Sequence, residues 1–295
     1  MAPTYTASMA NDHEALLARI VEWACGDASV LALILTGSRA WMGAVPDEFS
    51  DLDVEIIATD PGALAQDDRW WRAFGKVWVH LPLSDGQLYP TRLVFYDGGM
   101  KVDFSLCGVE RVREMVDAQQ LDGLHERGYR VLIDKTSVAA GLPAPSGAFP
   151  AKKLPNQGEF AATVAEFWFE AAHIPRYLLR DDLWVVKFRD WTMKTMLLRM
   201  IEWHALARSE RPVDVWYIGV HMKEWVDERT WTELHGVFSR FDVRASWDDL
   251  FATMTLFRRL ATETAALAGL EYAADVDADV SGYVVAFEER IAKGV

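Results

Sequence analysis

The chain has 295 residues, of which 51% are apolar and 25% are charged, and this balance is typical of a globular protein and not of a disordered one. A formal net charge of −14 argues against DNA, tRNA or an anionic membrane surface as a partner. The charge favours a cationic small molecule, although acidity can also serve solubility alone. No signal segment is visible and no apolar run approaches the roughly 18 residues that span a bilayer, so we expect a cytoplasmic protein.

Residues 11–26 carry apolar side chains at helical spacing and predict the first helix. The apolar run 31–35 follows and predicts a strand, which ends where the chain turns at Gly37-Ser38. A glycine at such a turn lets a ligand approach the backbone closely. Free backbone N–H groups and a small hydroxyl at this position suggest a phosphate site.

The next strand, at residues 51–57, has apolar side chains on one face and Asp51, Asp53 and Glu55 on the other, because side chains in a strand alternate. Carboxylates two residues apart lie roughly 6.6 Å from each other. At an effective dielectric constant near 20 they repel by about 2.5 kcal/mol. A cation would remove that repulsion, whereas an exposed acidic strand with no ligand is the alternative.

Three further strands are predicted at residues 76–81, 91–96 and 100–106, with turns at Gly86 and at residues 97–99. In the last of them Asp103 shares a face with Lys101 and Ser105. If this strand pairs beside the Asp51-Asp53 strand, a third carboxylate joins the acidic row. A charge at the edge of a hairpin is the alternative.

A short helix after Pro61, a helix at 109–121 and a strand at 129–133 complete this half. Lys135 follows that strand, where it either reaches a triphosphate or faces water. The order of elements predicts an α/β (α+β) unit with a mixed sheet over residues 1–140. The two cysteines, Cys25 and Cys107, are too few for a disulfide framework, and we expect both to be buried.

Residues 141–158 are rich in Pro, Gly and small side chains and predict a linker. From residue 159 to 295 the pattern is helical almost throughout, which predicts a bundle of five or six helices. This half holds eight of the thirteen Trp residues. We expect most of them in the core, with a few lining a cleft where a ring can stack on a ligand.

Gly37-Ser38, the Asp51-x-Asp53 pair and Asp103 together resemble the signature of the nucleotidyltransferase superfamily. Further motifs are similar to those of the aminoglycoside 6-adenylyltransferases, the streptomycin-modifying enzymes. These motifs are GSRAWMGAVPDEFSDLDVEI, YDGGMKVDFSL, YRVLIDK, AEFW and WYIG, and they run from Leu35 to Gly219. The resemblance therefore covers most of the chain.

The resemblance implies a nucleotidyltransferase domain followed by a helical substrate-binding domain, and Mg²⁺-dependent transfer of AMP from ATP to a hydroxyl of a streptomycin-like aminoglycoside. It also implies roles for individual residues. The metal ligands and catalytic residues would be Asp51, Asp53 and Asp103; the ATP phosphates would contact Gly37, Ser38, Arg39 and Lys135; and the substrate would contact Glu166 and Arg176. The chain departs from the family at Trp41, where an Asn is expected, at Leu52, where an aromatic is expected, and at Arg176, where a Lys is expected.

The proton of the attacking hydroxyl has two candidate acceptors. Asp103 could act as general base or complete the ligand set of a metal, and Glu166 is the second candidate base or a solvated helix residue.

Two other functions remain open. One is nucleotidyl transfer to a different small molecule, a protein or an RNA end, and the other is nucleotide binding without turnover.

Overall fold

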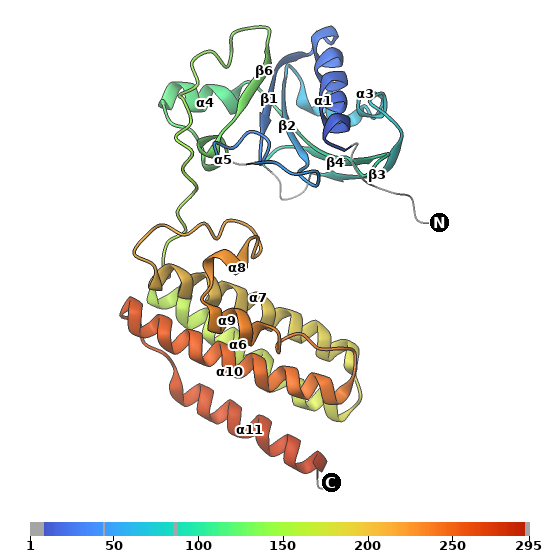
Figure 1. The fold of residues 1–295 in the computed structure, drawn as a ribbon. Coiled ribbons are helices and arrows are strands. Elements are labelled where there is room, and N and C mark those ends of the chain that lie inside the picture. The colour runs from blue at the N-terminus through green and yellow to red at the C-terminus, as the bar shows by residue number, and fades with distance from the viewer. Residues whose placement is uncertain (1–8, 44, 85–87, 293–295) are drawn as a thin grey trace. The chain divides into compact units, whose positions relative to one another are not determined.

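The computed structural model describes residues 9–43, 45–84 and 88–292 (Figure 1). The chain divides into two compact units, Met1–Pro150 and Ala151–Val295. The predicted linker, 141–158, spans the division, and its residues up to Asn156 form no helix or strand. The predicted turn at Gly86 lies outside the described residues.

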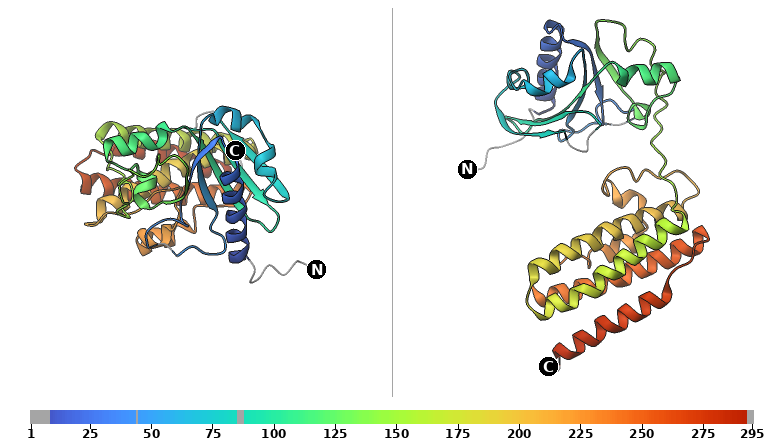
Figure 2. Two further views of the ribbon diagram at one scale, coloured as in Figure 1. Left: turned by 90° about the horizontal axis from the view of Figure 1, so that it is seen from above. Right: turned by 180° about the vertical axis from the view of Figure 1, so that it is seen from behind.

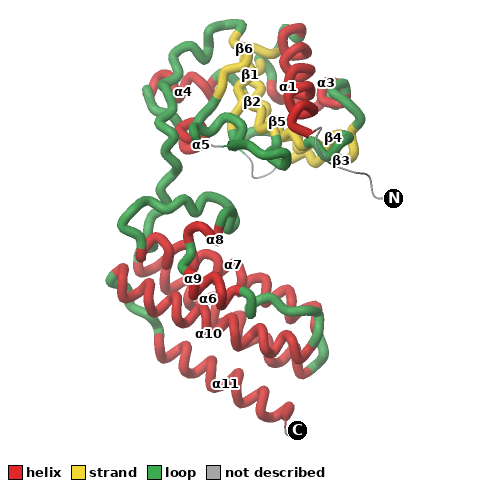
Figure 3. The backbone as a smooth tube through the Cα atoms, in the orientation of Figure 1, coloured by secondary structure: helices red, strands yellow, loops and turns green. Residues whose placement is uncertain are grey.

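A six-stranded mixed sheet forms the centre of the N-terminal unit, with the strand order β3-β4-β5-β2-β1-β6 (Figure 3). Its neighbouring strands are antiparallel except β2 and β5, which run parallel. The sheet and the helical region that follows confirm the predicted α/β (α+β) class. The strands are β1 (Val30–Thr36), β2 (Leu52–Ala58), β3 (Val77–Leu83), β4 (Thr91–Tyr96), β5 (Lys101–Cys107) and β6 (Arg130–Asp134).

Helices cover both faces of this sheet. On one face α1 (Met9–Gly26), α2 (Pro61–Gln66) and α3 (Arg69–Arg72) bury an apolar cluster that includes Trp70 and Trp71. On the other face α4 (Glu110–Ala118) packs through Val112 on a smaller cluster. The strands β1 and β2 are therefore buried on both sides.

Two helices differ from the sequence expectation. The helix predicted at 109–121 ends at Ala118 because Gln119 adopts a left-handed conformation, with φ of 48°. A separate short helix, α5 (Gly123–Arg127), follows and is capped by Asp122, whose carboxylate accepts hydrogen bonds from two backbone N–H groups. The single helix expected after Pro61 is two short helices, α2 and α3.

The C-terminal unit is helical, as predicted. In it α7 packs against α6 and α10, and α11 packs against α6 (Figure 2). Phe167 of α6 stacks on Phe257 of α10 inside the core, with ring centroids 3.6 Å apart. The helices are α6 (Gln157–Leu179), α7 (Leu183–Arg208), α8 (Met222–Trp225), α9 (Glu228–Leu234), α10 (Val243–Ala268) and α11 (Ala274–Ala292).

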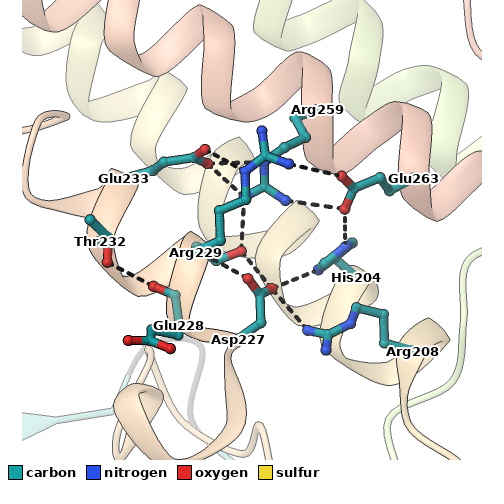
Figure 4. Close-up of polar contacts among 10 residues, drawn as sticks. His204, Arg208, Asp227, Glu228, Arg229, Thr232, Glu233, Arg259 and Glu263 are labelled. Atoms are coloured by element: carbon teal, nitrogen blue, oxygen red, sulfur yellow. Dashed lines mark hydrogen bonds and ion pairs between the residues drawn. The ribbon is translucent and has the colours of Figure 1, made fainter.

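Charged side chains tie the short helix α9 to α7 and α10 (Figure 4). The buried His204 of α7 contacts Glu263 of α10 at 2.7 Å, and burial lowers the pKa of this imidazole. Arg259 of α10 donates to Glu233 of α9 at 2.6 Å. A second network lies elsewhere between α7 and α10, where the buried Lys194 donates to Asp190, Asp249 and Thr253. These ion pairs and hydrogen bonds add directional contacts to the apolar packing between the helices.

Trp168 and Trp247 of this half are buried in the core, and Trp203 and Trp225 pack against it. Trp184 and Trp191 of α7 are 80% and 67% exposed and Trp216 is also exposed, so the expectation that most of the tryptophans lie in the core is met only in part. Leu197, Ile201 and other α7 residues fill the core instead.

Cys25 is exposed, contrary to expectation, and Cys107 is buried as predicted. No helix within the described residues has the length and apolar character needed to cross a membrane.

Candidate active site

The strand arrangement brings three carboxylates together at one end of the central strands β2 and β5. Because β2 and β5 are parallel neighbours, Asp53 lies directly opposite Asp103. Asp51 immediately precedes β2, and the antiparallel β1 ends beside Asp53 at Thr36. One carboxylate oxygen from each aspartate lies within 4.8 Å of the others. The 100–106 strand therefore pairs beside the Asp51-Asp53 strand, which is the condition under which Asp103 joins the acidic row.

The electrostatics of this cluster favour a cation. Burial, with Asp51 and Asp103 nearby, raises the pKa of Asp53 to about 7. Burial also raises the pKa of Asp103, against the opposing effect of Lys101. Among the described residues, none gives the buried Oδ1 of Asp103 a hydrogen bond. Carboxylate oxygens are the ligands that Mg²⁺ prefers, so the donor set and its excess negative charge fit such an ion.

The turn after β1 needs glycine. Gly37 has φ of +67°, a conformation that other residues rarely adopt. A Cβ on Gly37 would lie 1.9 Å from Oδ2 of Asp53, so the carboxylate can contact the turn only because Gly37 has no side chain. Ala40 and Trp41 then donate their backbone N–H groups to the carbonyl of Gly37. Ser38 follows Gly37 in this turn, so Gly37, one of the predicted phosphate-binding residues, lies against Asp53 and Ser38 is the next residue in the chain.

Arg39 is placed in the same turn but is engaged locally. Its guanidinium donates from Nε to the carbonyl of Ser50 at 2.8 Å and from Nη2 to the carbonyl of Asp47 at 3.3 Å. These bonds hold the end of the polar insert immediately before Asp51. The phosphate contact that the resemblance implies for Arg39 stays a prediction beside these two observed contacts.

Lys101 is a site residue that the sequence reasoning did not select. Its Nζ donates to Oδ2 of Asp51 at 2.6 Å and to Oδ2 of Asp103 at 2.7 Å. The signal was present in the sequence, because Lys101 and Asp103 are two residues apart on one strand and must share a face.

Glu55, the third acid of the predicted row, does not belong to the cluster. It is buried further along β2, where it pairs with Arg111 of α4 at 3.0 Å and with His125 of α5 at 3.2 Å. Burial disfavours a charged imidazole, but the hydrogen bonds to Asp122 and Glu55 prevail and raise the pKa of His125 to about 9. The helices covering this face explain the difference, since an uncovered strand would have left Glu55 in water.

Lys135 lies at the other end of β1 from the carboxylates. Because β6 runs antiparallel to β1, the end of β6 meets the beginning of β1, and the Lys135 N–H donates to the carbonyl of Leu31. Leu31 and Thr36 are five residues apart, about 17 Å at roughly 3.3 Å per residue. The ammonium of Lys135 donates to the carbonyl of Asp27. The structure does not bring Lys135 to the carboxylates, and we leave it out of the proposed site.

Glu166 and Arg176 lie apart on α6. Ten residues separate them, which corresponds to about 15 Å along a helix axis. Glu166 lines a groove of about 320 Å³ with Trp203 and Arg199 of α7. Arg176 donates instead to the hydroxyl of Tyr283 on α11 at 3.1 Å. The groove lined by Glu166 therefore does not include Arg176, and the substrate contacts of both residues stay predictions.

Trp41, one of the departures from the family pattern, lies in the loop that follows the Gly37-Ser38 turn. Its ring lies 4.6 Å from the guanidinium carbon of Arg127. Gly128 makes this packing possible, because a Cβ there would lie 2.4 Å from the carbonyl oxygen of Ala40. The N–H of Met42 also donates to the carbonyl of Arg127. The short helix α5 thus fixes the loop that carries Gly37 and Ser38.

The mixed sheet brings a Gly-Ser turn, a D-x-D pair and a third carboxylate together at one end of its central strands. This combination defines a nucleotidyltransferase. The model of the streptomycin adenylyltransferase family matches residues 10–287, and the chain belongs to that family.

Two curated relatives are each named aminoglycoside 6-adenylyltransferase. The relative from Bacillus subtilis (strain 168) is 26% identical over 247 residues, which cover 81% of this chain and 85% of the relative. The relative from Campylobacter jejuni is 24% identical over 273 residues, covering 90% and 92%. A crystal structure of an aminoglycoside 6-adenyltransferase from Bacillus subtilis is similar over 94% of this chain and 97% of that chain, with 20% identity and a TM-score of 0.43.

Proposed function

We propose that this protein is a Mg²⁺-dependent adenylyltransferase that transfers AMP from ATP to a hydroxyl of a streptomycin-like aminoglycoside and so inactivates the antibiotic. The observation that carries the proposal is the cluster of Asp51, Asp53 and Asp103 beside the Gly37 turn. The names of the two relatives support the acceptor class. Use of ATP as co-substrate favours the cytoplasm as the place of reaction.

Asp51, Asp53 and Asp103 would hold the metal. When bound, Mg²⁺ would offset negative charge on the phosphates of ATP and help pyrophosphate to leave. The unpartnered Oδ1 of Asp103 and the raised pKa of Asp53 support this assignment, because the single ammonium of Lys101 does not offset the burial and mutual repulsion of the three carboxylates.

Phosphate binding and proton transfer would use the side chains and backbone at this end of the central strands. The turn at Gly37-Ser38 offers a backbone without a side chain and a small hydroxyl to the phosphates. The acceptor hydroxyl oxygen forms a bond to the α-phosphorus while the bond to pyrophosphate breaks, and the hydroxyl proton passes to a carboxylate. Asp103 is our candidate for that carboxylate if it does not serve as a full metal ligand. Glu166 is the second candidate.

The acceptor carries several positive charges, which suits a chain with a net charge of −14. We place part of its recognition at Glu166, whose groove combines a carboxylate with the ring of Trp203. A substrate contact of Arg176 stays a prediction, and its Nε also donates to the hydroxyl of Tyr283 on α11.

The test of the metal assignment is Asp53→Asn, which keeps the shape of the side chain and removes its charge. We expect pyrophosphate release from ATP, Mg²⁺ and streptomycin to fall by at least about 10³-fold, the scale at which catalytic electrostatics act. Circular dichroism and thermal unfolding should remain close to those of the wild type, since the substitution relieves repulsion. Retention of most of the activity would mean that the metal site is misassigned.

A further inference from the structure

Lys101 occupies the position in which a cation is expected. It begins β5 two residues before Asp103, so both side chains lie on the same face of the sheet. Its ammonium bridges Oδ2 of Asp51 and Oδ2 of Asp103 at 2.6 and 2.7 Å. Asp51 immediately precedes β2 and Asp103 lies in β5, so the ammonium joins the start of β2 to the start of β5.

The charges around the ammonium do not balance. Three carboxylates meet here within 4.8 Å, and like charges at that distance repel. One ammonium offsets part of the repulsion and leaves the cluster with excess negative charge. The shortage of positive charge is clearest at Oδ1 of Asp103, which accepts no hydrogen bond from any described residue.

A divalent cation and the ammonium would compete for the same carboxylates. We propose that Lys101 is a built-in counter-ion: it holds Asp51 and Asp103 together in the metal-free protein, is displaced when the divalent ion binds, and then contacts the triphosphate of ATP. The proposal rests on the proposed function of the carboxylate cluster. In these terms Lys101 is a positioning residue before loading and a substrate contact afterwards.

The chemistry of lysine suits this exchange. Its ammonium is a compact charge on a flexible four-carbon stem, whereas arginine presents a rigid fork that would bind a carboxylate in two places. The Lys101 side chain is 28% exposed, so it has room to change rotamer. The ATP phosphates are themselves anionic, so the displaced ammonium does not lose its electrostatic partner.

Lys101→Met tests the proposal, because methionine keeps an unbranched stem and removes the charge. Mn²⁺ is titrated into the nucleotide-free protein, and free Mn²⁺ is followed by electron paramagnetic resonance. We expect Mn²⁺ to bind about tenfold more tightly to the variant, which corresponds to about 1.4 kcal/mol. The melting temperature without metal should fall and should recover with saturating Mn²⁺. ATP binding at saturating Mn²⁺ should weaken, because the contact with the triphosphate is lost.

Lys76→Met is the matched control. Lys76 lies in the same unit, is largely exposed and is 3.9 Å from Asp97, outside the cluster. Its removal should leave Mn²⁺ binding, ATP binding and the metal dependence of melting unchanged.

Unchanged or weaker Mn²⁺ binding by a folded Lys101→Met protein would overturn the displacement, and unchanged ATP binding would overturn the later contact. Asp53→Asn separates this proposal from the proposed function. If the wild type binds Mn²⁺ no better than Asp53→Asn, the metal site fails and the Lys101 proposal fails with it. If Mn²⁺ binding changes as expected but no aminoglycoside is modified, only the assignment of the acceptor fails.

Discussion

Gly37 determines the geometry of the site at the scale of single residues. Its backbone is left-handed, and the space where a Cβ would lie is taken by the carboxylate of Asp53. The sequence predicted that a ligand needs this space. The structure shows that a protein carboxylate also needs it, which no reading of one strand at a time can reveal, because the contact depends on the pairing of β1 with β2.

We predict that Gly37→Ala lowers the free energy of unfolding by about 1–3 kcal/mol, the usual cost of a strained backbone, and that it weakens Mn²⁺ binding because Asp53 must move. Urea denaturation and Mn²⁺ titration measure the two effects. Gly26→Ala is the control, since a Cβ at Gly26 would meet nothing within 4 Å in the described part of the chain. Equal stability and metal affinity in Gly37→Ala and Gly26→Ala would contradict this account of the turn.

At the scale of elements, the pattern of apolar side chains was enough to locate the strands of the sheet to within about two residues, through alternation in β2 and β5 and through an unbroken apolar run in β1. It did not reveal that Glu55 is enclosed by α4 and α5. The left-handed Gln119, which separates these two helices, carries no sequence signal of the strength of a glycine. The partners of Glu55 could therefore not be predicted.

The pairing of Glu55 with Arg111 and His125 leads to a pH prediction. The folded pKa of His125, about 9, lies above the ordinary value of 6.5, so its contribution to stability is fully present below pH 6.5 and is lost as the pH rises through about 9. The difference between the two values corresponds to a contribution on the order of 3 kcal/mol. We predict that His125→Gln is less stable than the wild type at pH 6.

The stability difference between wild type and His125→Gln should shrink between pH 7 and pH 10, because the imidazole of the wild type loses its proton there. Urea denaturation of both proteins at each pH gives the difference directly and removes the titration of groups that the two proteins share. A difference that is constant across this range would mean that His125 is neutral in the folded protein.

At the scale of the whole molecule, composition and periodicity predicted a mixed-sheet half followed by a helical half, because each depends on long stretches of pattern. The position of the tryptophans was not predictable in this way. Trp184, Phe188 and Trp191 recur at helical spacing on α7 and so look like core residues, yet they are exposed. Periodicity identifies an apolar face but does not say what covers it.

The central claim is transfer of AMP to an aminoglycoside, and mass spectrometry tests it most directly. The purified protein is incubated with ATP, Mg²⁺ and a panel of aminoglycosides that includes streptomycin, and the molecular mass of each antibiotic is measured afterwards. We predict that streptomycin gains the mass of one AMP with the wild type and gains nothing with Asp53→Asn. A panel that remains unmodified by the wild-type protein would contradict the assignment of the acceptor.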